Sequence, residues 1–232
     1  MKKLLIKYSI EFFVIVISIS VSFFVENVRE DLEKDSRRIV VLSNLLNELE
    51  SNKSYVDFHK KVLSENLQIL ESYLKDSLTV DGIKNLNQNR FSPANAFFTA
   101  ISFNPSVSIY NSLVNDGSLN LIKSPDIKAR IDNLYVETFN SISNSKKIEE
   151  ISAVRADNLF VDEYSDLYVR NFWNNFNDNE LMQDFINIIK VNTRFKALMM
   201  QKASMLDAKL RKVNEYISQR DTLIIAIKKS LP

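Results

Sequence analysis

Residues 12–25 read FFVIVISISVSFFV, a run without a charged side chain, and this stretch decides how the chain is built. The apolar character extends back to Leu4, interrupted by one lysine, one glutamate and several serines. A helix from Leu4 to Val25 rises about 33 Å at 1.5 Å per residue, enough to cross a hydrocarbon core about 30 Å thick. We therefore expect residues 1–27 to form a short cytoplasmic tip and a transmembrane anchor.

A cleaved signal peptide is the alternative interpretation of this segment. Lys2 and Lys3 provide a basic start, and Ser20-Val21-Ser22 has the small-x-small pattern of a cleavage site. No helix breaker precedes that site, and the sequence continues without glycine or proline as far as Asp81. This continuity favours an anchor that runs on into a longer helix.

The orientation of the anchor follows from the charges at its two ends, which are nearly balanced. Three lysines precede its uncharged run 12–25, and four basic residues follow that run within the range that the positive-inside rule counts. Because an uninterrupted apolar segment resembles a signal-anchor, we expect a cytoplasmic N-terminus. The protein is then a single-pass protein of the bacterial inner (cytoplasmic) membrane with an extracytoplasmic C-terminal domain.

One stripe of the first helix carries polar side chains that favour helix packing in the membrane. Glu11, Ser18, Ser22 and Arg29 fall on this stripe, and Ser18 with Ser22 is a small-xxx-small pair that lets two helices approach closely. We predict membrane-helix packing through Glu11, Ser18 and Ser22. The alternative is that the serines have no role in helix packing and that Glu11 lies at the lipid interface.

Glycine is scarce, and its scarcity indicates the fold class. The 232 residues include two glycines, whereas sheets, hairpins and phosphate-binding loops use glycine at their turns. Beyond the anchor, apolar residues recur at alternating steps of three and four, which is the heptad pattern of a coiled coil. This pattern predicts a long helix over about 28–78, with its kink expected at 51–54.

Residues 79–124 differ from the rest because Gly82, Pro93 and Pro105 occur there among several phenylalanines. We expect short helices over 94–104 and 107–115, the second ended by a left-handed Asp116-Gly117 cap. These helices would cap the end of a bundle that lies away from the membrane. Their aromatic side chains are the predicted interaction surface: Phe97, Phe98, Phe103 and Tyr110.

Two further long helices are expected after this segment. Ser124 is a typical N-cap followed by proline, so one helix begins at Pro125 and continues to about Trp173. Another follows from about 181 to 227. Residues 28–232 are therefore predicted to form an elongated antiparallel, up-down-up bundle of three long helices, with 79–124 as its short-helix cap segment.

This path would bring the end of the second long helix back to the membrane. Phe172, Trp173 and Phe176 are there, and aromatic side chains are favoured at the lipid interface. We therefore list them as membrane-proximal aromatics. The alternative is that they close the lower end of the bundle core.

Part of the sequence resembles a bacterial family of single-pass membrane proteins known as a domain of unknown function. The resemblance covers about the first 140 residues and rests on the anchor Glu11–Val25 followed by Glu26-Asn27, and on a later pattern: Tyr110, Leu113, Gly117, Leu119, Leu121, Ile122, Ile127, Ile131 and Tyr135. The chain departs from the family in having Ser18-Ile19-Ser20 where glycine and alanine are usual. The resemblance implies a membrane anchor and a helical exported domain, and it implies no activity.

Composition argues against most kinds of chemistry. The net charge of +1 creates no field that would attract nucleic acid. Cysteine is absent, so the chain lacks a thiolate nucleophile and sulfur metal ligands. A His-based triad would have to centre on His59, the single histidine, which lies in a stretch that looks exposed. We interpret the carboxylates around Glu149 and Asp162 and the base Lys209 as solvated surface groups. We predict no catalytic residue, no metal site, no cofactor and no nucleic-acid partner.

These observations favour a non-enzymatic, membrane-anchored scaffold or interaction protein that forms oligomers. Its expected partners are membrane lipid and either further copies of the chain or another membrane protein. One alternative is a sensory helical bundle that binds a ligand and signals through a membrane partner. Another is an accessory subunit of a membrane transport or defence complex.

Overall fold

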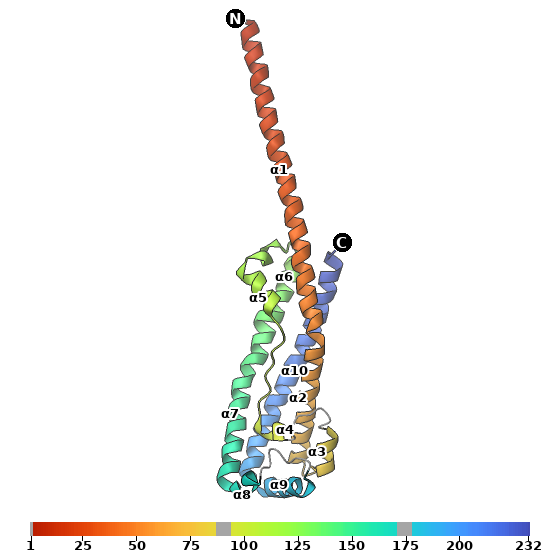
Figure 1. Ribbon diagram of the computed structural model, residues 1–232, viewed down its shortest axis with the longest axis vertical. Helices are drawn as coiled ribbons and strands as arrows, with labels where there is room; N and C mark the ends of the chain where they lie inside the picture. The colour runs from red at the N-terminus through yellow and green to blue at the C-terminus, as the bar shows by residue number, and fades with distance from the viewer. Residues whose placement is uncertain (1, 87–93, 171–177) are drawn as a thin grey trace.

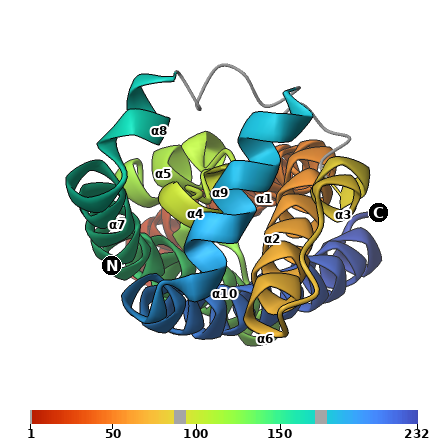
Figure 2. The same ribbon diagram turned by 90° about the horizontal axis from the view of Figure 1, so that it is seen from below.

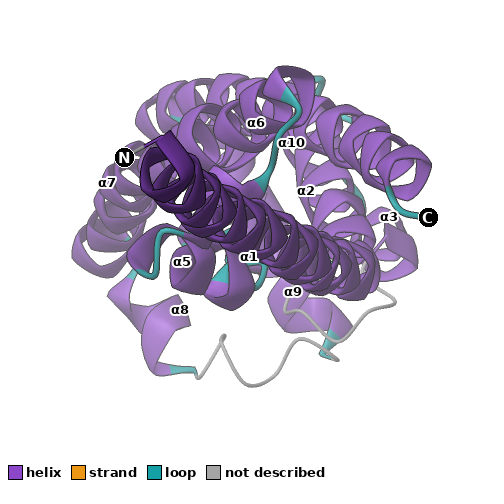
Figure 3. Ribbon diagram, turned by 90° about the horizontal axis from the view of Figure 1, so that it is seen from above, coloured by secondary structure: helices purple, strands orange, loops and turns teal. Residues whose placement is uncertain are grey.

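The computed structural model describes residues 2–86, 94–170 and 178–232, and in these ranges the regular structure is entirely helical (Figure 3). The prediction of an all-α fold is confirmed. Helix α1 runs from Lys2 to Ser51 and is followed by α2, Lys53–Leu74. The first part of α1 projects far beyond every other element, and the end of the molecule away from this projection is called the far end (Figure 1).

The rest of the chain forms short helices at the two ends of the domain and two further long rods. The elements in chain order are α3 (Val80–Leu86), α4 (Ala94–Phe98), α5 (Ser108–Asn115), the 3-10 turn η1 (Ser118–Leu121), α6 (Pro125–Asp132), the π-helix η2 (Asn133–Thr138), α7 (Phe139–Glu163), α8 (Ser165–Val169), α9 (Asn179–Val191) and α10 (Thr193–Ser230). Elements α6, η2 and α7 follow one another without a gap and form one rod.

Several helix boundaries lie where local chemistry predicts them. The Ser124 hydroxyl accepts a hydrogen bond from the Ile127 amide at 3.3 Å, which caps α6 ahead of Pro125. Gly117 has φ +73°, so the residue after the α5 C-cap adopts the left-handed conformation that glycine tolerates. The boundary between α1 and α2 falls at Asn52, inside the expected kink. These boundaries depend on local sequence and could be predicted.

The directions of the long rods differ from the predicted up-down-up order. Helix α10 runs antiparallel to α2, because Lys228 near its end pairs with Glu50 at 2.7 Å whereas Lys196 near its start pairs with Asp76 at 3.0 Å. It also runs antiparallel to α7, as Figure 1 shows. Consequently α7 runs in the same direction as α1 and α2, from the end where α1 projects toward the far end. The C-terminus therefore lies near the end from which α1 projects.

An extended segment makes this arrangement possible. Residues 99–107, called the strap, have no helical structure and connect α4 at the far end with α5 at the other end (Figure 1). The strap carries the chain back, so the next rod can run away from α1's projection again. The helix expected over 94–104 thus ends at Phe98, because the following backbone is hydrogen-bonded by side chains of the long helices.

The expected cap is therefore divided between the two ends of the domain. Helices α3 and α4 lie at the far end together with α8, and α9 crosses that end when the molecule is viewed from below (Figure 2). Helix α5 and turn η1 instead pack against α1 at the opposite end. The expectation that 79–124 forms one cap at the far end is corrected accordingly.

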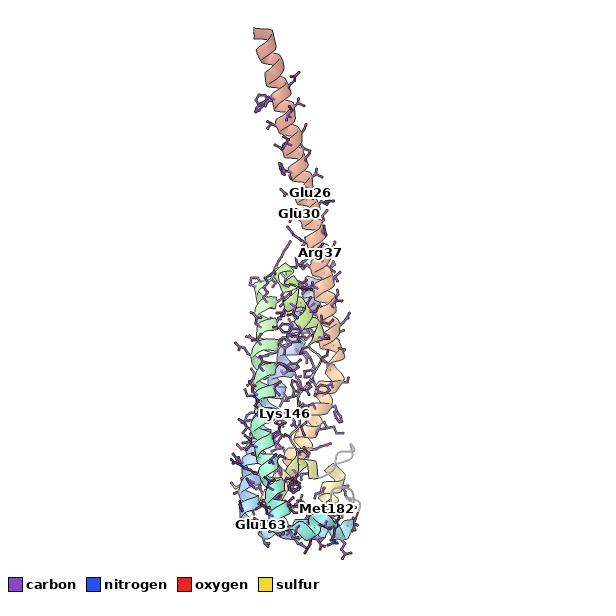
Figure 4. All side chains as sticks on the ribbon, turned by 60° about the vertical axis from the view of Figure 1, so that its left-hand side comes forward. Glu26, Glu30, Arg37, Lys146, Glu163 and Met182 are labelled. Atoms are coloured by element: carbon purple, nitrogen blue, oxygen red, sulfur yellow. The ribbon has the colours of Figure 1, made fainter. Side chains whose placement is uncertain are left out.

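Phe172, Trp173 and Phe176 lie outside the described residues. Their flanking helices α8 and α9 both lie at the far end, where Figure 4 shows Glu163 and Met182. The prediction that these aromatics return to the membrane required a second rod running toward the projecting helix. Because α7 runs the other way, the structure removes the basis for that prediction.

Candidate functional site

The projecting part of α1 is exposed around its whole circumference. Every residue from Phe12 to Val25 is exposed, large apolar side chains included. Among the described residues, one helical stretch, within Glu11–Leu74 and so along α1 and α2, is long and apolar enough to cross a membrane, with a mean hydropathy of 1.8 in its most apolar window. None of that window is buried. Such a surface is unfavourable in water, because each exposed apolar Å² costs about 25 cal/mol.

The serines of this segment satisfy their hydroxyl groups within the helix. Ser18 donates to the Val14 carbonyl at 2.8 Å, and Ser22 donates to the Ser18 carbonyl at 2.9 Å. Both serines and Glu11 are exposed, and the described part of the chain places no second helix against them. The predicted packing through these three residues therefore stays a prediction, and the hydroxyls could be buried by a partner without losing a hydrogen bond.

A charged stalk, residues 26–38, joins the exposed apolar segment to the helical domain. Its charges pair along the helix: Arg29 with Glu26 at 2.7 Å, Lys34 with Glu30 at 3.2 Å, and Arg37 with Glu33 at 2.5 Å. Glu26, Glu30 and Arg37 are labelled on this part of α1 in Figure 4. A helix without a buried face is sustained by such pairs at positions three and four apart.

A second unusual feature is the way in which the domain holds the strap. Asn52 binds both backbone polar groups of one residue, donating to the Ser106 carbonyl at 2.7 Å and accepting from the Ser106 amide at 2.8 Å. The Tyr55 hydroxyl accepts from the Asn104 amide at 2.7 Å and donates to the Ser102 carbonyl at 3.3 Å. Side chains thus supply the hydrogen-bond partners that a helix or sheet would otherwise give to this backbone.

A buried ion pair holds the middle of the strap. Glu149 of α7 and Lys209 of α10 approach to 2.7 Å, and each side chain is 2% exposed. Glu149 also accepts from the Ile101 amide at 3.2 Å, and Lys209 also donates to the Ile101 carbonyl. The pair was expected on the surface, and the structure corrects that interpretation. Each charge has a partner charge and a backbone partner, as burial demands.

Lys202 holds the beginning of the strap by donating to the Thr99 carbonyl at 2.8 Å. Burial lowers the pKa of Lys202 to about 8, because the ammonium form loses its hydration. The negative charge of Glu149 partly opposes this change, and the positive charge of Lys209 adds to it. The interior near the strap therefore contains two lysines for one carboxylate.

Glu48 of α1 caps the helix that follows the strap. Its carboxylate accepts hydrogen bonds from the Ile109 amide at 2.6 Å and from the Tyr110 amide at 3.3 Å, at the N-terminus of α5. The Tyr135 hydroxyl donates to the same carboxylate at 3.0 Å, and burial raises the pKa of Tyr135. Tyr110 stacks on Tyr135 with the ring centroids 4.2 Å apart. Tyr110 is therefore half-buried in this contact.

The other aromatics of the predicted interaction surface belong to the core. Phe97, Phe98 and Phe103 are all buried, so their assignment to a surface is wrong. Phe97 and Phe98 lie in the aromatic cluster of the far end against Phe185. Phe103 extends from the strap between His59 and other rings, at a centroid distance of 5.0 Å from His59. Aromatic residues in a glycine- and proline-containing segment had suggested exposure, but they anchor it.

His59 is 3% exposed, and its Nε2 atom makes no hydrogen bond to the described residues. Burial, together with the positive charge of Lys209, lowers the pKa of His59 to about 4. The ring is therefore neutral at pH 7. It also lines a mainly apolar cavity of about 380 Å³ beside the strap, together with Tyr55, Phe58 and Val62.

The buried polar groups carry a sequence signal that a search for catalytic motifs misses. Along α1 and α2 the buried positions follow steps of three and four, and three of the four buried polar residues are seven apart: Asn52, His59 and Asn66. In α10 the same register places Lys202 and Lys209 at positions seven apart. Polar residues that recur at core positions of a heptad indicate a row of buried polar groups along the helix.

Comparisons of the chain with protein-family models, with curated proteins and with solved structures give no match. The function is therefore inferred from the exposed helix and the buried network themselves.

Proposed function

We propose that this chain is a non-enzymatic, membrane-anchored helical scaffold or interaction protein of the bacterial inner membrane, forming oligomers there. In this proposal residues 1–27 contain the cytoplasmic tip and the single membrane span. Residues 28–232 form an elongated bundle of long helices on the extracytoplasmic side. Membrane lipid and another membrane-embedded helix are its partners.

The exposed segment Phe12–Val25 carries the proposal. It is apolar on every side, it projects beyond the domain, and a charged stalk follows it (Figure 1). A helix that is apolar all round is expected in a large core or in lipid, and the described domain provides no core for it. Four buried polar side chains of the domain, those of Asn52, Glu149, Lys202 and Lys209, hold the strap, which is a structural task.

Membrane attachment is tested with charged substitutions in the exposed segment. We expect the full chain to stay in the membrane pellet after alkaline carbonate extraction, and Val16→Arg/Ile19→Arg to release it. Each arginine at the centre of a membrane helix costs about 2.5–3.5 kcal/mol. The matched control is Ile148→Arg/Ile151→Arg, which puts the same charges at exposed apolar positions of α7.

Extraction of the unaltered chain by carbonate would contradict the proposal. Mass spectrometry of the mature N-terminus provides the second readout, since a chain starting after Ser22 would identify a cleaved signal peptide. The side of the membrane is determined by protease added to intact spheroplasts, which should digest the domain if it is extracytoplasmic. Protection of the domain in this assay would reverse the proposed orientation.

The cavity beside the strap favours a second candidate function, a sensory bundle that signals through a membrane partner. The lining of this cavity is mainly apolar and also contains the Tyr55 side chain and the neutral His59 ring. Such a lining suits a small uncharged molecule that is mostly aromatic or aliphatic. We expect such a ligand to raise the melting temperature of the full chain in detergent. Ala100→Trp, which fills the cavity, should abolish that rise. A panel of such compounds without any thermal shift would rule against this candidate.

A further inference from the structure

The exposed part of α1 carries a regular stripe that continues from the apolar segment into the stalk. Its positions follow one another in steps of four and three, as in a coiled-coil seam. All six side chains are exposed, none is charged, and five are aliphatic: Val14, Ser18, Val21, Val25, Val28 and Leu32. We call these six residues the seam.

Lipid does not account for the lower part of the seam. Leu32 lies seven residues beyond Val25, which is about 10 Å along the helix and past the end of the apolar segment. Its side chain is 66% exposed, and that of Val28 is 43% exposed, within a stretch that is otherwise strongly charged. Something that extends from lipid into water is needed to cover the whole seam.

Most charges of the stalk lie away from the seam, but Arg29 borders it, about 60° around the helix from Leu32. At 100° per residue, Glu30 is about 160° around the helix from Leu32, and Arg37 about 140°. Both residues are already paired within the helix, with Lys34 and Glu33 respectively. Arg29 is paired with Glu26 at 2.7 Å, so a neighbour that packs on the seam meets a neutralised charge at its edge and breaks no ion pair.

The helical domain also leaves the seam open. Leu45, which is fully buried in the core, lies about 140° around α1 from Leu32. The domain is thus on the side of α1 away from the seam. At the next seam position, Asp35 is bound to Lys123 of the domain at 2.8 Å. The seam therefore ends where the domain begins, and two copies paired through it would carry their domains on opposite outer sides.

We propose that a second copy of this chain covers the seam, packing in parallel against Val14–Leu32 as a coiled coil that passes from lipid into water. This inference rests on the proposed membrane anchoring. A copy in the same membrane presents an identical seam at the same height and in the same direction. The steps of three and four suit such pairing. Burial of Ser18 leaves no unsatisfied hydroxyl, because its hydrogen bond stays within the helix.

Single-cysteine crosslinking in native membranes tests the pairing, and the chain has no cysteine of its own to interfere. Facing Cα atoms of helices packed about 9 Å apart come within the roughly 4.4–6.8 Å that a disulfide spans, whereas outward positions are separated by about 13 Å. We expect oxidation to give a covalent dimer with Val25→Cys, Val28→Cys and Leu32→Cys. The control variants Asn27→Cys and Glu30→Cys should give at least five-fold less dimer.

Equal crosslinking at all five positions, or strongest crosslinking at Asn27 and Glu30, would overturn the proposal. A crosslinked product with a mass other than two chains would assign the seam to a different membrane protein and would also overturn it. The same membranes are extracted with carbonate before oxidation. Retention without crosslinking contradicts the pairing alone, whereas loss of the chain at this step contradicts the anchoring on which the pairing rests.

Discussion

Replacing Lys209 by methionine is expected to lower the free energy of unfolding of the full chain by about 3–5 kcal/mol, because it removes the ion-pair partner of the buried Glu149. The Ile101 carbonyl loses its donor in the same change. Methionine fills a similar volume, so the loss of packing is small. Urea denaturation in detergent micelles, followed by circular dichroism at a wavelength that reports helix, measures the difference.

Two comparisons determine whether the buried charge is the cause. Lys146 pairs with Glu150 at 3.0 Å, but both side chains are more than 40% exposed, so Lys146→Met should cost less than about 1 kcal/mol. The double variant Lys209→Met/Glu149→Gln should be more stable than Lys209→Met alone, since it removes the unpaired carboxylate and keeps an acceptor for the Ile101 amide. A double variant as unstable as the sum of its parts would refute the explanation.

The free energy of unfolding should fall between pH 6.5 and pH 4.5, and replacing His59 by phenylalanine is expected to make this fall about 2–3 kcal/mol smaller. In the folded chain the pKa of His59 is lowered to about 4, whereas the unfolded chain protonates near pH 6.5. Between these two pKa values the unfolded chain binds a proton at His59 and the folded chain does not. The contribution of His59 to stability is therefore present above pH 6.5 and is lost as the pH falls toward 4.

The measurement is the free energy of unfolding at pH 7 and pH 4.5, for the unaltered chain and for His59→Phe. Buried carboxylates titrate in both chains, so the informative quantity is the difference between the two pH dependences. Phenylalanine retains the ring contacts with Tyr55 and Phe103. Identical pH dependences for the two chains would show that His59 is accessible to protons in the native state.

Local sequence determined much of the architecture. The scarcity of glycine and the steps of three and four predicted helices, and Ser124 and Gly117 marked a start and an end that the structure confirms. These features depend on residues within one or two helical turns of each other, and such interactions persist whatever the rest of the chain does.

The strap could not be predicted in this way. Residues 99–107 contain Phe103 and Pro105 but no strand-like alternation, and their extended conformation depends on partners about 50 to 110 positions away in the sequence. Lys209 and Glu149 were interpreted as surface charges because a single helix does not reveal which face will be covered. Their burial becomes favourable only when each meets the backbone of the strap or an opposite charge.

The sequence by itself thus determined that this chain is helical, and that its first helix carries an apolar segment followed by a charged stalk, because these properties follow from composition and from local periodicity. Only the tertiary structure decided the direction of the rods, the path of the strap and the burial of its charged partners. The physical reason is that hydrogen bonds and ion pairs between distant residues form only after the helices have packed, and many different packings satisfy the same local pattern.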